Sequence, residues 1–286
     1  MKFLITGATG FIGNHLINEL LKDSGNEIIA TSRDITKAKK YKWFNRVRYI
    51  EYSICLNDID IDLYTLFEKP DCLIHLSWEG LPHYDSLIHI EKNIYHNYSF
   101  IKNLVQNGLK NISLAGTCME YGMLNGELYE DTNTQPSNSY AIAKDTLRIF
   151  LEELNKNFDF QLKWIRLFYM YGEGQSEKSL LSQVDNTIKN AEASFNMSFG
   201  EQLRDYLPIS EVISNIILIS KQDKVLGCIN CCSNKPISVR HLVENYLKEK
   251  NYSLKLNLGY YPYSKLEPMY FWGNNSKLKL IKEEYE

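Results

Sequence analysis

Tyr140 and Lys144 have the side chains and the spacing needed for proton transfer. On an α-helix, residues four positions apart lie on the same face. A lysine ammonium beside a phenol favours the phenolate, which lowers a phenol pKa that is ordinarily about 10. The pair therefore predicts a tyrosine that donates or accepts a proton near neutral pH.

The Tyr-x-x-x-Lys spacing alone is not specific, because the chain contains 20 tyrosines. The same spacing also occurs at Tyr98/Lys102, Tyr246/Lys250 and Tyr261/Lys265. Of the four, only Tyr140 follows a loop that comes after a predicted central strand, at residues 112–115. Ser137 and Ser139 are candidate caps for its helix. Context thus selects Tyr140 and Lys144, against the alternative of an ordinary surface pair.

Three glycines near the N-terminus, Gly7, Gly10 and Gly13, indicate a second kind of chemistry. They follow the apolar run at residues 3–5 and open an apolar-periodic segment, which predicts a strand, a tight turn and a helix. A helix N-terminus has unpaired N–H groups and a partial positive charge, so it favours a phosphate. A dinucleotide is the default ligand of this arrangement, and a glycine-rich loop without a ligand is the alternative.

The remaining patterns predict an α/β fold that positions these residues. Apolar runs predict strands at residues 2–6, 27–31, 48–51, 72–76, 112–115 and 161–167. Helical patterns lie between them, near residues 11–22, 60–68, 86–107 and 139–156. This alternation predicts a Rossmann-type, doubly wound parallel sheet. Residues 1–166 would form the dinucleotide-binding domain, with 206–235 returning to it, and 167–286 a smaller substrate-binding lobe.

Past residue 166 the pattern is irregular and predicts fewer elements. A helix is expected near Ser210, whose hydroxyl would cap it, with residues 212–219 buried. Residues 227–232 are strand-like, and residues 237–250 are helical with Ser238 as a candidate cap. Residues 174–205 mix helix-like and strand-like pieces.

Composition narrows the possible partners. The net charge of −3 gives no electrostatic reason to bind nucleic acid or an anionic membrane. The six cysteines lack zinc-ligand spacing, and His83, His89 and His96 are expected at a surface or interface, so no metal site is predicted. Apolar runs are shorter than the roughly 18 residues that span a bilayer. With a strand at the very start and no targeting segment, we expect a cytoplasmic protein.

The glycine motif and four later segments are similar to a known family. Thr6-Gly-Ala-Thr-Gly-Phe-Ile-Gly13 resembles the G-x-x-G-x-x-G turn of the extended short-chain dehydrogenase/reductases, which act mostly on nucleotide sugars. Residues 71–77 resemble the fourth strand of that family, D-x-x-I-H-L-A, and residues 115–122 resemble its S-S-x-x-V-Y-G segment. Residues 166–172 resemble R-x-F-N-x-Y-G, and residues 204–212 resemble R-D-F-x-x-V-x-D-V. The resemblance covers roughly residues 1–235.

The resemblance assigns roles by position. It gives the proton-transfer triad as Thr117, Tyr140 and Lys144, with Thr117 hydrogen-bonded to the reacting oxygen. The cofactor would contact Gly7, Thr9, Gly10, Phe11, Ile12, Gly13, Ser32, Arg33, Ser53, Ile54, Leu76, Ser77, Tyr140 and Lys144. The substrate would contact Trp78, Cys118, Met119, Tyr169 and Arg204. Tyr169 stands where the family commonly has Asn. Arg204 would bind the sugar-nucleotide phosphates, or else pair with Asp205 or Glu201.

The end of the second strand bears on the choice of cofactor. Family members that use NAD usually have an acid there, which binds the ribose hydroxyls. Here Ser32 takes that position and Arg33 follows it. A hydroxyl next to a guanidinium favours a 2′-phosphate. We therefore expect NADP(H) to be preferred, with NAD(H) possible. In the alternative, Arg33 points to solvent and Asp34 binds the ribose.

Two positions after Thr117 bear on the reaction. Dehydratases of the family resemble T-D-E-x-Y-G, in which the two acids move protons, but here these positions are Cys118 and Met119. Neither side chain can serve as the required carboxyl group, which argues against 4,6-dehydration. Residues 78–82 together with 116–122 resemble bacterial nucleotide-6-deoxysugar reductases that make dTDP-fucose or CDP-abequose.

The resemblance thus implies NADPH-dependent reduction of a 4-keto-6-deoxy sugar on dTDP, CDP or GDP, in deoxysugar biosynthesis for surface glycans. A nucleotide-sugar 4-epimerase with tightly bound NAD is the main alternative. A non-catalytic NADP-binding protein is the other. A homodimer is also expected, because the two helices near 86–107 and 139–156 form a four-helix bundle in relatives. Their apolar residues could instead face the sheet: Ile94, Phe100, Ile101, Leu104, Leu147, Phe150, Leu151 and Leu154.

Overall fold

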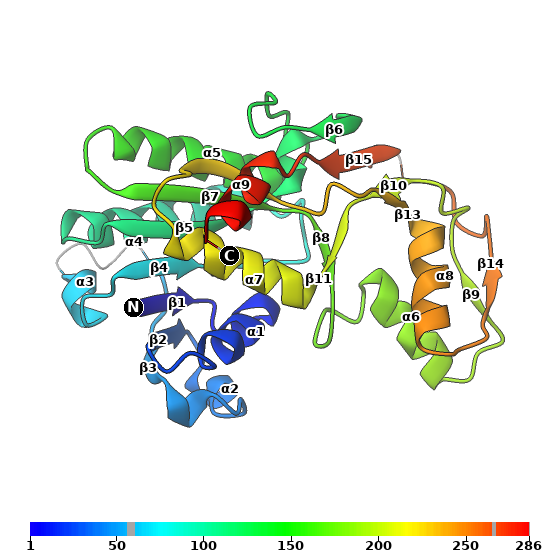
Figure 1. The fold of residues 1–286 in the computed structure, drawn as a ribbon, viewed down its shortest axis with the longest axis horizontal. Coiled ribbons are helices and arrows are strands. Elements are labelled where there is room, and N and C mark those ends of the chain that lie inside the picture. Colours follow the sequence, from blue (N-terminus) through cyan, green and yellow to red (C-terminus); the bar gives the residue numbers. More distant parts are fainter. Residues whose placement is uncertain (56–60, 265–266, 286) are drawn as a thin grey trace.

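A seven-stranded parallel sheet forms the centre of the computed structural model, which describes residues 1–55, 61–264 and 267–285. The strand order is β12-β7-β5-β4-β1-β2-β3, and every pair is parallel. The strands are β1 (Lys2–Thr6), β2 (Glu27–Ser32), β3 (Arg48–Glu51), β4 (Cys72–His75), β5 (Asn111–Thr117), β7 (Gln161–Leu167) and β12 (Gly227–Cys231). The predicted fold class is confirmed (Figure 1).

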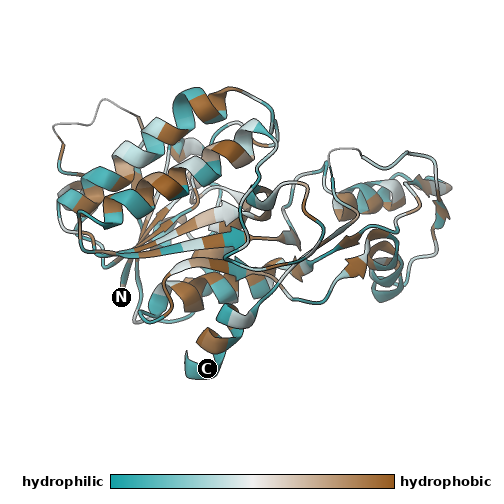
Figure 2. Cartoon of the chain, turned by 90° about the horizontal axis from the view of Figure 1, so that it is seen from above, coloured by the Kyte–Doolittle hydropathy of each residue, from teal (hydrophilic) through white to brown (hydrophobic). Residues whose placement is uncertain are grey.

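Helices cover both faces of this sheet, because strand residues alternate between two apolar layers. Phe3 and Ile5 pack in one buried cluster, whereas Leu4 between them packs in the other. The first layer contains α1 (Phe11–Leu20), α7 (Ile209–Lys221) and α9 (Ser276–Tyr285). The second contains α3 (Leu63–Leu66), α4 (Ile94–Gln106) and α5 (Ser139–Asn155). Figure 2 shows the hydrophobic strands between these layers.

Several predicted helix boundaries differ in the structure. The helix expected over 86–107 begins as a π-helix, η2 (His89–Asn93), and continues as α4. The helix expected over 60–68 is only α3, and residue 60 lies outside the described residues. The second strand is followed by a single turn, α2 (Ile35–Ala38), and the third is preceded by a 3₁₀ turn, η1 (Phe44–Arg46).

Three candidate caps were wrong and one is confirmed. Asn138 caps α5 by accepting a hydrogen bond from the Ala141 amide at 2.8 Å, so neither Ser137 nor Ser139 does. Pro208 precedes α7, which has no side-chain cap, and Ser210 lies inside the first turn. Ser238 caps α8 (Val239–Glu249) through the His241 amide at 3.1 Å, as predicted.

A smaller lobe lies beyond the carboxyl ends of the strands (Figure 1). Its apolar cluster brings together α6 (Leu180–Lys189), α8 and the pair β9 (Ser194–Asn196) and β14 (Lys255–Asn257). A ribbon of β8 (Tyr169–Tyr171) and β11 (Tyr206–Pro208) leads into it. A four-stranded sheet contains β13 (Ile237–Ser238), β10 (Leu203–Arg204), β15 (Tyr270–Gly273) and β6 (Gly126–Leu128). The chain returns to the large sheet at α7 and β12, and again at α9.

A buried lysine on a strand of the large sheet leads to a stability prediction. Lys163 on β7 is fully buried, and its ammonium donates to Asn111 Oδ1 at 2.7 Å and to the Ser220 carbonyl at 3.4 Å. No ion pair to it is found among the described residues. Burial lowers the Lys163 pKa to about 8. In the unfolded chain a lysine keeps its proton up to about pH 10.4, so protonation of Lys163 favours the unfolded state.

Lys163→Met is therefore expected to stabilise the fold by about 2 kcal/mol at pH 7. The cost of the buried charge is fully present below pH 8 and declines as the pH rises toward the unfolded value. The advantage of the variant should thus shrink between pH 8 and about 10.4. Urea unfolding at pH 7 and pH 10 measures both effects. A variant less stable than the parent at pH 7 would show that the ammonium is well compensated.

Candidate functional site

The glycine turn packs directly against the end of β4. Gly7 has a φ of +67°, and a Cβ there would lie 2.9 Å from the carbonyl carbon of Leu76 and the amide nitrogen of Ser77. A Cβ on Gly13 would lie 2.4 Å from the Gly7 carbonyl oxygen. Only glycine fits at either position. Gly10 precedes α1 with no side-chain cap, so the first N–H groups of the helix are free to bind an anion.

A cavity of about 250 Å³ lies over this turn. Nine of the residues predicted to bind the cofactor line it: Gly7, Thr9, Gly10, Ser32, Arg33, Ser53, Ile54, Leu76 and Ser77. Trp78, predicted as a substrate contact, lines it too. Phe11, Ile12 and Gly13 lie in the first turn of α1 and do not line the cavity. The sequence reasoning missed other lining residues: Thr6, Thr31, Lys37, Tyr52, Glu79, Asn93, His96 and Asn97.

The end of β2 presents a hydroxyl and cations to this cavity. The Ser32 hydroxyl lies 2.8 Å from the Tyr49 hydroxyl, and Arg33 forms an ion pair with Glu79. Lys37 adds a second cation to the lining. Asp34 instead caps α2 by accepting from the Lys37 amide at 2.9 Å. One oxygen of the Asp34 carboxylate is thus engaged at the helix end.

A buried histidine links the glycine turn to α4. The Thr6 hydroxyl donates to His75 Nδ1 at 2.9 Å, and His75 Nε2–H donates to Asn97 Oδ1 at 2.8 Å. This tautomer follows because the Asn97 amide nitrogen donates to the Asn93 carbonyl. The Thr6 oxygen also accepts from the Leu76 amide at 3.1 Å. Burial lowers the His75 pKa to about 3, so the ring is neutral and holds β1, β4 and α4 together.

The predicted triad comes together at the end of β5. The Tyr140 phenol is hydrogen-bonded to Thr117, and the Lys144 ammonium donates to the Ala115 carbonyl at 2.9 Å. All three triad side chains belong to residues that are less than a tenth exposed. Tyr140 and Lys144 are one turn apart on α5, and Thr117 is the last residue of β5. The carboxyl end of a central strand thus meets the N-terminal half of a helix.

Burial controls the acidity of the two titrating members. It raises the Tyr140 pKa well above its usual range, and the neighbouring Tyr84, Glu120 and Cys118 act in the same direction. It lowers the Lys144 pKa to about 7. The expectation of a depressed Tyr140 pKa is therefore not met in this structure, because desolvation dominates. Tyr140 keeps its proton at neutral pH, as a proton donor requires.

A buried ion pair holds Thr117 in place. The Glu120 carboxylate accepts from the Thr117 amide at 2.8 Å and from Arg166 Nε at 2.7 Å, and Trp164 donates to it at 2.9 Å. The Thr117 hydroxyl oxygen accepts from the Met119 amide at 3.2 Å, which completes a capping box around the 3₁₀ turn η3 (Cys118–Tyr121). Sequence reasoning missed Glu120, although an acid three residues after a threonine is the signal of such a box.

On the lobe side, Arg204 lies over Tyr169. Its guanidinium carbon is 5.7 Å from the centre of the Tyr169 ring, and Nη2 donates to Glu267 at 3.1 Å. Arg204 is buried, whereas Glu267 is half exposed. The suggested partners have other contacts. Asp205 accepts from the Ser233 amide, and Glu201 from the Tyr263 hydroxyl.

The Cys118 thiol follows Thr117 in η3 and, with Met119, occupies the two positions where dehydratases have acids. Burial raises the Cys118 pKa far above its usual range. The thiol therefore stays protonated and neutral, and a thioether has no proton to exchange. This pair cannot perform acid–base chemistry.

Two of the other Tyr-x-x-x-Lys pairs lie apart from the triad. Tyr246 donates to Asp185 in the lobe, and Tyr98 packs edge-on against Phe150. Lys265 lies outside the described residues.

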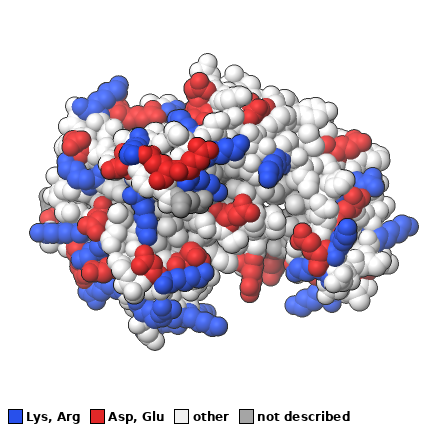
Figure 3. Space-filling model, in the orientation of Figure 1, with Lys and Arg blue, Asp and Glu red and all other residues white. Residues whose placement is uncertain are grey.

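Across the described ranges, no cluster of three metal-ligating side chains occurs and no helix could cross a bilayer. Figure 3 shows both signs of charge interspersed over the visible face.

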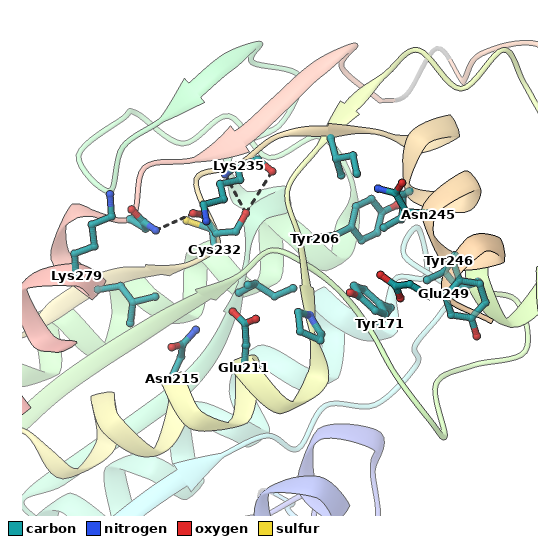
Figure 4. A pocket seen from close by; sticks show the side chains of 18 of the residues that line it. Tyr171, Tyr206, Glu211, Asn215, Cys232, Lys235, Asn245, Tyr246, Glu249 and Lys279 are labelled. Carbon is teal, nitrogen blue, oxygen red and sulfur yellow. Dashed lines mark hydrogen bonds between the residues drawn. The ribbon is translucent and has the colours of Figure 1, made fainter. Parts of the chain in front are cut away.

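A second, larger cavity of about 540 Å³ lies between α7, α8 and α9. Glu211 and Asn215 of α7 line it together with Tyr246 of α8 and Lys279 of α9 (Figure 4). None of the predicted site residues lines this cavity. The glycine turn lines the smaller cavity, whereas Thr117, Tyr140 and Lys144 line neither of the two.

Comparisons with known proteins classify the chain. The family model of the NAD dependent epimerase/dehydratase family matches residues 3–232. The chain is 30% identical to the dTDP-6-deoxy-L-talose 4-dehydrogenase (NAD(+)) of Aggregatibacter actinomycetemcomitans, over 96% of this chain and 99% of that protein. It is 27% identical to the dTDP-4-dehydro-6-deoxyglucose reductase of Escherichia coli, over 84% and 79% of the two chains.

The fold is also that of solved relatives. The UDP-glucuronic acid 4-epimerase of Bacillus cereus superposes with a TM-score of 0.82 at 22% identity, over 99% of this chain and 93% of that one. At that identity the match supports a conclusion about the fold alone. The sequence matches carry the classification: the chain belongs to the NAD dependent epimerase/dehydratase family, the extended short-chain dehydrogenases/reductases.

Proposed function

We propose that this protein reduces the C4 ketone of a nucleotide-linked 4-keto-6-deoxy sugar, with NADPH as the reductant. One observation carries the proposal. Two hydrogen-bonded hydroxyls, of Thr117 and the protonated Tyr140, lie beside Lys144, and the next two positions hold no acid. Such a site can protonate one oxygen but cannot move the further protons of a dehydration. In the cell, this reaction would take place in the cytoplasm and supply deoxysugars for surface glycans.

The residues fit a dinucleotide, because the Gly7 and Gly13 positions admit no Cβ and the α1 N-terminus is uncapped. The bound nicotinamide would supply hydride to C4. Thr117 and Tyr140 would hold the C4 oxygen, and Tyr140 would give that oxygen its proton as the carbonyl becomes an alcohol. Lys144 would bind the nicotinamide ribose, and its charge would favour the phenolate left on Tyr140.

Other predicted contacts complete the proposed substrate site. Arg204 would bind the diphosphate, since its guanidinium offers paired donors and its present partner, Glu267, is half exposed. Cys118, Met119 and Tyr169 would border the sugar. The nucleotide is dTDP, CDP or GDP on this proposal. Turnover of 4-keto-6-deoxy sugars on each of the three carriers, followed by NADPH absorbance, would identify it.

The sequence relatives favour chemistry at C4. Those in Aggregatibacter actinomycetemcomitans and Escherichia coli are named for a 4-dehydrogenase and for a reductase of a 4-dehydro sugar. A 4-epimerase is the second candidate, because the family model that matches the chain is that of the NAD dependent epimerases and dehydratases. Denaturing the purified protein separates the two. Stoichiometric released NAD, with turnover that needs no added cofactor, would contradict the reductase; dependence on added NADPH supports it.

The proposed preference for NADPH rests on Ser32, Arg33 and Lys37 at the adenosine end of the cavity. Ser32→Asp should reverse it, because a carboxylate repels a 2′-phosphate and accepts hydrogen bonds from a free ribose hydroxyl. We expect kcat/KM for NADPH to fall at least about tenfold while that for NADH is kept or rises. Both values come from initial rates. A parent enzyme that prefers NADH would contradict the assignment.

We also propose a homodimer formed through α4 and α5. Of the apolar positions suggested by the sequence, seven are buried in the single chain: Ile94, Phe100, Ile101, Leu104, Leu147, Leu151 and Leu154. All except Ile94 pack in the apolar layer against the sheet, and none of the seven is available to a partner. Phe150 is exposed, together with Tyr95, Ile142 and Ile149 on the same two helices. Sedimentation velocity tests the proposal, which a monomer at micromolar concentration would contradict.

A further inference from the structure

Trp78 covers the buried ammonium of the triad. The Lys144 Nζ lies 3.9 Å from the centre of the Trp78 ring, and it donates a hydrogen bond to the Ala115 carbonyl at 2.9 Å. Within the described residues no carboxylate forms an ion pair with Lys144. Glu120 acts on it only at a distance and is already paired with Arg166. The Ala115 carbonyl and the indole face are therefore the direct compensation for this buried charge.

The orientation of the indole is fixed by His89 in η2. Trp78 Nε1–H donates to His89 Nδ1 at 3.1 Å, and His89 Nε2–H donates to the His83 carbonyl at 2.9 Å. The two rings are nearly parallel, 23° apart. The loop that follows Trp78 packs closely against His89. A Cβ on Gly80, whose φ is +85°, would lie 2.9 Å from His89 Cε1. His89 is fully buried and thus serves to orient Trp78.

We propose that Trp78 is a positioning residue, whose indole face keeps Lys144 charged and in place before the cofactor binds, with His89 locking the ring. Its relevance to turnover rests on the proposed function; the contact itself does not. The sequence interpretation placed Trp78 against the sugar, and this proposal assigns it to the lysine.

The chemistry of the surroundings makes this contact consequential. A cation over an indole is stabilised more strongly when both are desolvated. The other titratable groups facing Lys144 supply no countercharge, since Tyr140 keeps its proton, His75 is neutral and Glu120 is paired. Burial lowers the Lys144 pKa to about 7. A change of one unit in the Lys144 pKa therefore changes the fraction of Lys144 side chains that are charged near neutral pH.

The test measures the Lys144 pKa in the cofactor-free protein by NMR of ¹³C-labelled lysine ε-carbons, with the signal identified by its absence from Lys144→Met. Trp78→Leu should lower this pKa by about one unit. Trp78→Phe, which keeps an aromatic face, should lower it less. His89→Leu should also lower the Lys144 pKa. In His89→Gln, whose side chain can still accept from the indole N–H, the Lys144 pKa should stay close to the parent value. Trp272→Leu, on β15, is the matched control and should leave it unchanged.

An unchanged Lys144 pKa in both Trp78→Leu and Trp78→Phe would overturn the proposal. If Trp78→Leu does not fold, Trp78→Phe and the two His89 variants decide the question in the same way. A second readout is the pH profile of kcat, whose decline with rising pH should move to lower pH in Trp78→Leu. Since the NMR titration uses no substrate, a pKa that falls in a protein without reductase activity would refute the proposed function and leave the positioning role standing.

Discussion

Tyr140→Phe is expected to lower kcat for the keto sugar by about 10³-fold or more. The variant keeps the ring that packs against Trp78 and Tyr84 and removes only the hydroxyl that would protonate the forming alkoxide. Cofactor binding should change less than about twofold, because Lys144 and the glycine turn are untouched. Initial rates with the keto sugar measure kcat, and a fluorescence titration with NADPH measures cofactor binding.

Tyr98→Phe is the matched control for this experiment. Tyr98 has the same spacing to a lysine, at Lys102, but lies on α4 against Phe150 and away from Thr117. Its loss should leave kcat unchanged. A Tyr140→Phe enzyme that retains a tenth of the parent activity would show that another group donates the proton.

Arg166→Met is expected to destabilise the protein by about 3–5 kcal/mol. Arg166 and Glu120 are both buried. Removing Arg166 leaves the Glu120 carboxyl group, whether charged or protonated, without its main partner. Glu120 also fixes the Thr117 amide, so the surviving folded enzyme should turn over more slowly. Urea denaturation and activity of the same preparation measure both consequences.

An exposed pair provides the contrast. Arg240→Met breaks the surface pair with Glu244 on α8 and should cost no more than about 0.5 kcal/mol. The double variant Glu120→Val with Arg166→Met should recover part of the stability, since two apolar groups leave no buried charge. Similar losses for the Arg166 and Arg240 variants would contradict the structural role assigned to the buried pair.

The large sheet and the glycine turn were predictable because their signals are local. β1 is built around the apolar run Phe3–Ile5, and four of the seven residues of β7 are apolar. The glycine positions are required by backbone contacts that no other residue permits. The lobe was not predictable in the same way. Its strands, such as β10 and β13, are only two residues long, which is too short to show a period of two. Their pairing depends on tertiary contacts.

The candidate site also combines residues with a local sequence signal and residues placed by tertiary contacts. Tyr140 and Lys144 could be predicted because helical spacing brings them together. Glu120, His89 and the indole over Lys144 depend on contacts between segments, and the contact between Trp78 and Lys144 spans 66 residues along the chain. The caps failed for a related reason. Asn138, Ser137 and Ser139 are all good capping residues, and only the entry path of the chain into α5 selects Asn138.

The most direct test of the central claim follows one hydrogen atom. The purified enzyme is incubated with dTDP-4-keto-6-deoxyglucose, or its CDP or GDP counterpart, and NADPH that carries deuterium at both C4 positions of the nicotinamide. The proposed reaction predicts one NADPH oxidised per sugar and deuterium at C4 of the alcohol formed, seen by mass spectrometry and NMR. Interconversion of 4-hydroxy nucleotide sugars without NADPH consumption, and with no deuterium at C4, would contradict it.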